Sequence, residues 1–214
     1  MLRTLLSGDL PRSRWVAALL IIVVGVLAFA PFLLPGAKAL NVAAKVLVFI
    51  LLVASYDLLL GYTGIVSFAH TMFFGIGAYG VAIASTRLGP GWGSVGLGLA
   101  AALAISLALA LLIGLFSLRV KAIFFAMVTL AVAAAFQTLA SQLSDLTGGE
   151  DGLTFKNPEW LSPSFETPLF GLAIDGKLIA YYALFVATAL LFLALLRIVN
   201  SPFGRVLQAK IGRA

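Results

Sequence analysis

Long apolar segments separated by short polar ones dominate the chain. Six stretches of about 20 residues stand out, and five of them contain no Asp, Glu, Lys or Arg. An apolar α-helix of about 20 residues is long enough to cross the ~30 Å hydrocarbon core of a bilayer. The pattern therefore predicts an all-α fold, a polytopic transmembrane bundle of about six helices. The predicted helices cover residues 15–34, 40–60, 65–86, 95–117, 123–143 and 178–196.

Two of these stretches have features that the other four lack. The second carries Lys45 and Asp57 towards its ends, where charged groups can reach water, so Asp57 is expected to be an interfacial or helix-terminal charge. The first could instead be a cleaved signal peptide, because Ala37-Lys38-Ala39 resembles a small-x-small cleavage site. Its apolar region is longer than the about 7–15 residues usual for a signal, so we predict that it is retained as a membrane helix.

Composition agrees with a membrane protein, since 62% of the 214 residues are hydrophobic and 10% are charged. Soluble domains carry about 25% charged residues. We therefore predict one transmembrane domain over residues 1–214 and no soluble domain. The longest segment outside the predicted helices, residues 144–177, contains Gly148-Gly149 and three prolines, which predicts an irregular loop. The chain has no cysteine, which excludes disulfides and thiolate catalysis.

The distribution of basic residues predicts the orientation. If the N-terminus is cytoplasmic, nine of the 14 basic residues flank inner helix ends and four flank outer ends. Loop 144–177 carries six of the eight acidic residues and would then be extracytoplasmic. Six crossings place both termini, including a tail at 200–214, on the cytoplasmic side. The inner residues are Arg3, Arg12, Arg14, Arg119, Lys121, Arg197, Arg205, Lys210 and Arg213.

The densest candidate site lies at residues 61–79. Gly61 and Gly64 are expected to form a tight turn between two helices. A stripe of small residues at helical spacing follows, and in lipid such a stripe lets another helix approach closely. Two interpretations remain open, a helix–helix interface and a translocation-path helix. The stripe comprises Ser67, Thr71, Gly75, Ala78 and Ala82.

His70, the only histidine, lies beside this stripe. It could relay protons or contact a substrate, or it could hydrogen-bond a neighbouring helix. No second imidazole or acidic cluster lies within helical reach, so no metal site is expected. Gly75-x-Gly77 resembles part of a dinucleotide fingerprint, but no strand precedes it, so no dinucleotide site is expected. No cofactor-binding or catalytic residue is expected in this chain.

The C-terminal end has the chemistry of one helix stopping and another starting. Ser201-Pro202 can do both, because proline in a first helical turn loses no hydrogen bond. A short helix would follow along the inner membrane face, with Phe203 and Arg205 exposed to a protein partner. Alternatively, the segment is a basic juxtamembrane tail held by anionic lipid.

Four blocks occur in a fixed order along the chain. They are Gly61–Tyr79, Leu118-Arg119 with Phe124 to Leu130, Leu146 to Leu153, and Ser201-Pro202-Phe203-Gly204-Arg205. Together they resemble the LivM-type permease subunit of bacterial branched-chain amino acid ABC importers, over about residues 40–209.

The resemblance implies a permease rather than an enzyme, in the bacterial inner (plasma) membrane. It would pair with a second, LivH-like permease, with two cytoplasmic ABC ATPases and with an extracytoplasmic substrate-binding protein, and it would not bind nucleic acid. The partners would hydrolyse ATP, so this chain would need no cofactor. The translocation-path or helix-packing residues would be Gly61, Gly64, Ser67, His70, Thr71, Gly75 and Gly77, and the ATPase-coupling residues Ser201, Pro202, Phe203, Gly204 and Arg205.

Three alternatives stay open. Similar permeases carry urea and short amides. Where the family continues into an acidic cytoplasmic segment, this chain reads Lys210-Ile211-Gly212-Arg213-Ala214, which resembles a truncated member and leaves a non-transporting membrane scaffold as a possibility. An ion-coupled secondary transporter would need paired intramembrane charges, for which only His70 is available.

Overall fold

The structure is a computed structural model, and its residues divide into two compact units. The first unit comprises Met1–Gly64 with Thr167–Ala214, and the second comprises Ile65–Glu166. The structure describes residues 14–33, 36–117, 122–162, 166–169 and 172–211. Five of the basic residues used to predict the orientation, Arg3, Arg12, Arg119, Lys121 and Arg213, lie outside the described residues.

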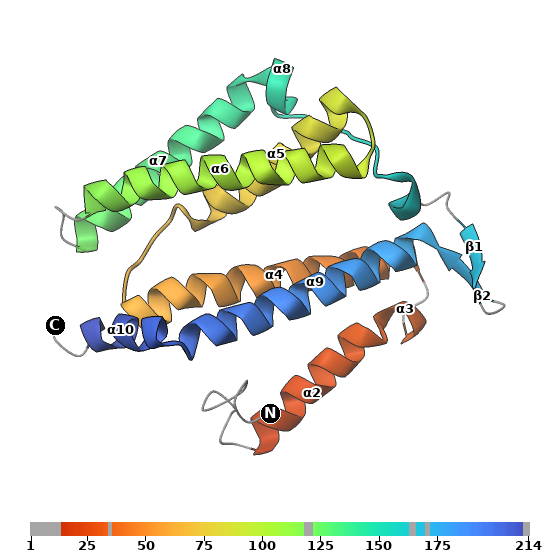
Figure 1. Ribbon diagram of the computed structural model, residues 1–214, viewed down its shortest axis with the longest axis horizontal. Helices are drawn as coiled ribbons and strands as arrows, with labels where there is room; N and C mark the ends of the chain where they lie inside the picture. The colour runs from red at the N-terminus through yellow and green to blue at the C-terminus, as the bar shows by residue number, and fades with distance from the viewer. Residues whose placement is uncertain (1–13, 34–35, 118–121, 163–165, 170–171, 212–214) are drawn as a thin grey trace. The chain divides into compact units, whose positions relative to one another are not determined.

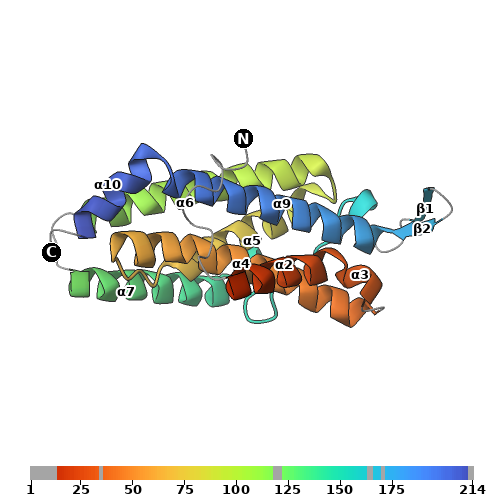
Figure 2. The ribbon, with the colours of Figure 1, turned by 90° about the horizontal axis from the view of Figure 1, so that it is seen from below.

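Two long helices, α4 and α9, lie side by side in the first unit (Figure 1). The shorter helices α2 and α3 pack on one end of this pair through an apolar cluster that includes Leu27, Ala30, Leu47 and Tyr181. Helix α10 follows α9 after a bend at its C-terminal end (Figure 2). The bounds are α2 Arg14–Ala28, α3 Ala30–Leu33, α4 Ala37–Thr63, α9 Gly176–Val199 and α10 Pro202–Ile211.

The first apolar stretch is broken, whereas the sequence predicted one helix over residues 15–34. Pro31 has no N–H, so the carbonyl of Leu27 loses the donor that a continuous helix would supply. The N–H of Phe32 bonds the carbonyl of Phe29 at 3.0 Å, which leaves the carbonyl of Ala28 without its usual donor as well. The helix therefore stops at Ala28 and resumes as α3.

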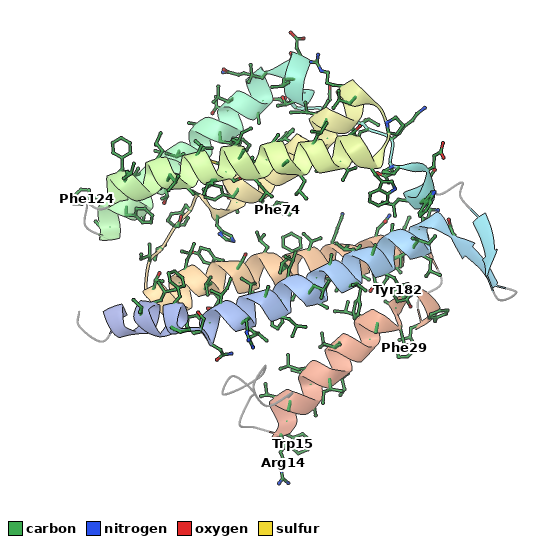
Figure 3. The ribbon with its side chains drawn as sticks, in the orientation of Figure 1. Arg14, Trp15, Phe29, Phe74, Phe124 and Tyr182 are labelled. Carbon is green, nitrogen blue, oxygen red and sulfur yellow. The ribbon has the colours of Figure 1, made fainter. Side chains whose placement is uncertain are left out.

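Two neighbouring tyrosines on α9 bond these two carbonyls. The hydroxyl of Tyr181 donates to the carbonyl of Leu27 at 2.5 Å, and that of Tyr182 donates to the carbonyl of Ala28 at 3.0 Å. Tyr181 is 2% exposed. Tyr182 and Phe29 lie at the same end of this unit (Figure 3). The tyrosine pair thus satisfies the backbone groups at the break, as an apolar environment requires.

Three helices form the core of the second unit. Helices α5 and α6 are joined by a short turn around Gly89, which forces them to run antiparallel, and α7 packs against α5 (Figure 1). The apolar cluster includes Met72, Ile76, Ala102 and Ile113, with Phe136 packed on it. The bounds are α5 His70–Leu88, α6 Trp92–Ser117, α7 Ala122–Gln142, α8 Ser144–Thr147 and a 3-10 turn, η1, at Glu159–Leu161.

Glycines allow the closest approach between α5 and α6. A Cβ on Gly98 would lie 2.5 Å from the carbonyl oxygen of Gly80 and 2.8 Å from the Cα of Val81. A Cβ on Gly80 would lie 2.8 Å from the Cβ of Ala102. The backbones are therefore in contact, which is the packing that small residues permit between membrane helices.

The connection between α7 and α9 contains more regular structure than the irregular loop predicted from its glycines and prolines. Besides α8 and η1, strands β1 (Glu166–Leu169) and β2 (Leu172–Asp175) pair into a two-stranded sheet. Asp175 then caps α9, and its side chain accepts a hydrogen bond from the N–H of Lys177 at 3.4 Å.

The chain is an all-α helical membrane protein, and this two-stranded sheet is a small addition to the helices. By length and composition, four helices in the described part of the chain can cross a bilayer, within α4, α6, α7 and α9. Helix α2, at 15 residues, is shorter, and α5 is less apolar and is not among the four. Many apolar side chains are exposed within the chain, among them Trp15, Phe74 and Phe124 (Figure 3), as expected of a surface covered by lipid.

Candidate functional site

The predicted turn at Gly61 and Gly64 is formed by only one of the two glycines. Gly64 ends α4 in the left-handed conformation, with φ 65°, and its N–H donates to the carbonyl of Leu60 at 3.2 Å. Gly61 lies inside the last turn of α4. A Cβ there would lie 2.6 Å from Oδ1 of Asp57, so Gly61 leaves room for that carboxylate.

The segment 65–69, which links α4 to α5, is not helical. The sequence predicted a helix from residue 65, whereas α5 begins at His70. Gly64 stops α4, and β-branched Ile65 and Val66 lose side-chain freedom in a helix, which disfavours an immediate restart. The small-residue stripe was predicted to follow one helix from Ser67, but Ser67 lies in the non-helical linker, so Ser67 and Thr71 do not share a helical face.

Threonine hydroxyls bond both backbone polar groups of Phe68. Its N–H donates to Oγ1 of Thr129 on α7 at 3.1 Å, and its carbonyl accepts a long bond from Oγ1 of Thr71 at 3.5 Å. Thr129 is 0% exposed. In the sequence, Thr129 falls within the family-like block from Phe124 to Leu130, and no role was predicted for it. A hydroxyl within an apolar helix was the signal that could have singled it out.

The remaining residues predicted from this block have varied surroundings. Ser67 is buried in the linker, and His70 is half-buried at the first position of α5. Thr71 is exposed, so it is available to a partner or to lipid. A Cβ on Gly75 would lie 3.1 Å from Cε1 of Phe136 on α7, whereas nothing lies within 4 Å of that position on Gly77.

The second candidate region is the start of α10. Ser201 is its N-cap, since Oγ accepts from the N–H of Gly204 at 3.3 Å while donating to the carbonyl of Ile198 at 2.6 Å. Pro202 occupies the first turn, where its missing N–H costs nothing. A Cβ on Gly204 would collide with the carbonyl of Val199, so glycine allows the sharp bend after α9.

This bend exposes apolar side chains at the start of α10. Phe203 is 61% exposed and Val206 is 68% exposed, while Gly204 is buried. Helix α10 packs on α4 and α9 within its own unit. Arg205 belongs to α10, but its side chain lies outside the described residues.

A third feature, not predicted as a site, is the tight turn after α7. The hydroxyl of Thr147 lies within 2.5 Å of the Ala140 carbonyl and 2.7 Å of the Leu143 carbonyl, and it accepts from the N–H of Gly149 at 3.3 Å. The guanidinium of Arg87 donates to the carbonyl of Asp145 at 2.8 Å, which ties α5 to this turn. Positive φ angles at Gly148, Gly149 and Gly152 close it.

A match to a family model identifies the protein family of the chain. The family model described as the permease component of the branched-chain amino acid transport system matches residues 38–210. The chain belongs to this family. The match runs from the start of α4 to the end of α10 and so includes both candidate regions. Neither a curated protein nor a solved structure matches the chain.

Membership places the described features in a multi-pass membrane permease. The apolar helices agree with that class, which is a transport component rather than an enzyme class. Hydroxyl-to-backbone bonds and close glycine contacts are the interactions that such a permease can use in place of the hydrophobic effect within lipid.

Proposed function

We propose that this chain is a permease subunit of an ABC importer for branched-chain or other hydrophobic amino acids. The observation that carries the proposal is the family match over residues 38–210. The fold supports it, because long apolar helices supply membrane crossings. A binding protein would deliver the substrate from outside, and two cytoplasmic ATPases would drive this chain together with a second permease subunit.

Within this proposal, the start of α5 contributes to the translocation path. Ser67, His70 and Thr71 are polar side chains gathered at a break in an otherwise apolar stretch. In membrane proteins, non-helical backbone is tolerated where it is buried in protein or lines a cavity, and such breaks commonly form substrate sites in transporters. Gly61, Gly64, Gly75 and Gly77 would serve close packing around it.

The start of α10 is proposed as the ATPase contact. Ser201, Pro202 and Gly204 fix the bend, and Phe203 is held outward by it. An exposed aromatic beside a basic residue is a common interface anchor. The proposed orientation, with both termini cytoplasmic in the inner membrane, puts this helix on the side where the ATPases bind.

Uptake into proteoliposomes tests the proposal. The chain would be reconstituted with a candidate second permease, the ATPases and the binding protein, and radiolabelled leucine and urea would be offered separately. ATP-dependent leucine uptake that needs this chain is the expected result. Uptake of urea alone would favour the amide branch of the family, and uptake of neither substrate would contradict an importer for these compounds.

A further inference from the structure

We propose that Thr129 is a positioning residue that holds the segment 65–69 out of the helix and thereby sets where α5 begins. The inference rests on the proposed function only in assigning the start of α5 to the transport path. Its physical content, a side-chain hydroxyl selecting one of two backbone conformations, concerns this chain alone.

The bonding of Thr129 sets it apart from other threonines on long helices. Thr63, Thr86 and Thr138 each donate to a carbonyl of their own helix, at Leu59, Ala82 and Ala134. Thr129 likewise donates to the Ala126 carbonyl, at 2.9 Å, but its oxygen also accepts from the N–H of Phe68, 61 positions away in the sequence. The side chain of Thr129 is fully buried, so water cannot replace its hydroxyl as the acceptor for Phe68.

The location explains why this bond matters. Thr129 lies seven residues after the start of α7, which is about 10 Å along the helix. An N–H at that depth in an apolar layer finds no water and must be bonded by protein. Thr129 is the acceptor that the structure supplies for Phe68.

The alternative conformation would bond Phe68 differently. If residues 65–69 wound onto α5, the N–H of Phe68 would be directed at the Gly64 carbonyl and would no longer need Thr129. Extending the helix would also turn Ser67, His70 and Thr71 onto one continuous helical surface. The Thr129 bond favours the non-helical state and so fixes how these three polar residues are presented.

The experiment uses the absence of native cysteine. Ser67→Cys places one thiol at a buried position in the held segment, 8% exposed. The full chain is placed in lipid nanodiscs, so that both membrane faces are accessible, and the labelling rate is measured with a small charged thiosulfonate reagent. Adding Thr129→Val should raise the labelling rate roughly tenfold, because the N–H of Phe68 would lack its acceptor in the held conformation and the segment would leave that conformation more often.

Two matched variants make the test specific. Thr138→Val removes a hydroxyl of α7 that, among the described residues, bonds a carbonyl of its own helix alone, and it should leave the labelling rate unchanged. Thr129→Ser keeps the acceptor oxygen and should label like the parent. If Thr129→Val does not accumulate while Thr129→Ser accumulates and stays protected, the hydroxyl requirement still holds.

Two outcomes would overturn the proposal. One is equal labelling of the parent, Thr129→Val and Thr138→Val. The other is failure of both Thr129 variants to accumulate, because serine keeps the hydroxyl and its failure would show that the hydroxyl alone does not explain the role of Thr129. Labelling needs neither ATP nor substrate. A failed uptake experiment would therefore leave this result standing, and unchanged labelling would leave the proposed function standing.

Discussion

Hydroxyl side chains bond backbone groups that leave the helical ladder in both units of this chain. In the first unit, Tyr181 and Tyr182 donate to the carbonyls exposed by the break at Pro31. In the second, Thr129 accepts from the N–H of Phe68. An apolar surrounding offers no water to such groups. Each break therefore requires a side-chain donor for a freed carbonyl or a side-chain acceptor for a freed N–H.

The tyrosine pair gives the first prediction. Tyr181→Phe removes the donor to the Leu27 carbonyl while keeping the ring that packs in the cluster. We expect a loss of about 1 kcal/mol of stability, in the range measured for hydrogen bonds between membrane helices. The loss of stability is measured by heating the purified chain in detergent and recording the fraction that stays monodisperse at each temperature.

Two further variants test the cause. Tyr79 stacks edge-on with Phe136, and its hydroxyl has no hydrogen bond given by the described residues, so Tyr79→Phe should be neutral. Pro31→Ala restores the N–H that a continuous helix offers to Leu27. The loss caused by Tyr181→Phe should therefore shrink in the Pro31→Ala background, and an equal loss in both backgrounds would contradict the explanation.

These residue-scale roles were only partly predictable. Pro31 inside an apolar stretch and hydroxyls inside apolar helices are visible in the sequence. Which carbonyl or N–H a hydroxyl reaches depends on how helices distant in sequence come together. Tyr181 and Leu27 are 154 positions apart, and no local pattern connects them.

At the scale of the helices, hydropathy located the helix centres but not the breaks. The stretch predicted at 123–143 became Ala122–Gln142, because apolar length alone sets such a helix. The stretch predicted at 15–34 broke after Ala28, and the one predicted from 65 started at His70. Both breaks depend on backbone hydrogen bonding, and an average of hydropathy over a window contains no information about such bonds.

The crossing of α5 and α6 gives the second prediction. Gly98→Ala would force a Cβ against the Gly80 carbonyl and the backbone of Val81, so the two helices must separate. We expect the folded state to lose about 1–3 kcal/mol of stability, as is typical of overpacking. Thermal stability and folded yield should both fall. Size-exclusion profiles of tagged protein before and after heating measure both.

Gly96 on the same helix is the matched control. Nothing lies within 4 Å of the position that its Cβ would occupy. Gly96→Ala should therefore be neutral or slightly stabilising, because alanine favours a helix more than glycine does. Equal effects of the two substitutions would mean that helix propensity, rather than the close crossing, governs this part of the unit.

At the scale of the whole molecule, charge asymmetry supplies the topology that packing within each unit does not. The acidic loop 144–177 and the basic inner flanks predict an outer and an inner side. Proposed coupling depends on this assignment, since the start of α10 can meet a cytoplasmic ATPase only from the inner side.

Single cysteines test this topology. Lys156→Cys, exposed after the Thr147 turn, should react with an impermeant thiol reagent in intact spheroplasts. Val206→Cys on α10 is 68% exposed but should react only after lysis, because the predicted topology assigns it to the cytoplasmic side. The reverse pattern would invert the orientation and would remove the basis for ATPase contact at α10.

The last prediction separates protein docking from lipid attraction at α10. Phe203→Ala should weaken ATPase capture roughly thirtyfold, because truncating an anchor aromatic often costs about 2 kcal/mol. Attraction of a basic tail to anionic lipid acts through charge, so it would be insensitive to this aromatic. The chain would be immobilised in nanodiscs and titrated with a candidate ATPase, with Phe49→Ala as a control. Phe49 is similarly exposed, at 59%, but lies within α4. Equal affinity for the parent and both variants, together with loss of binding when anionic lipid is omitted, would assign α10 to the membrane surface instead.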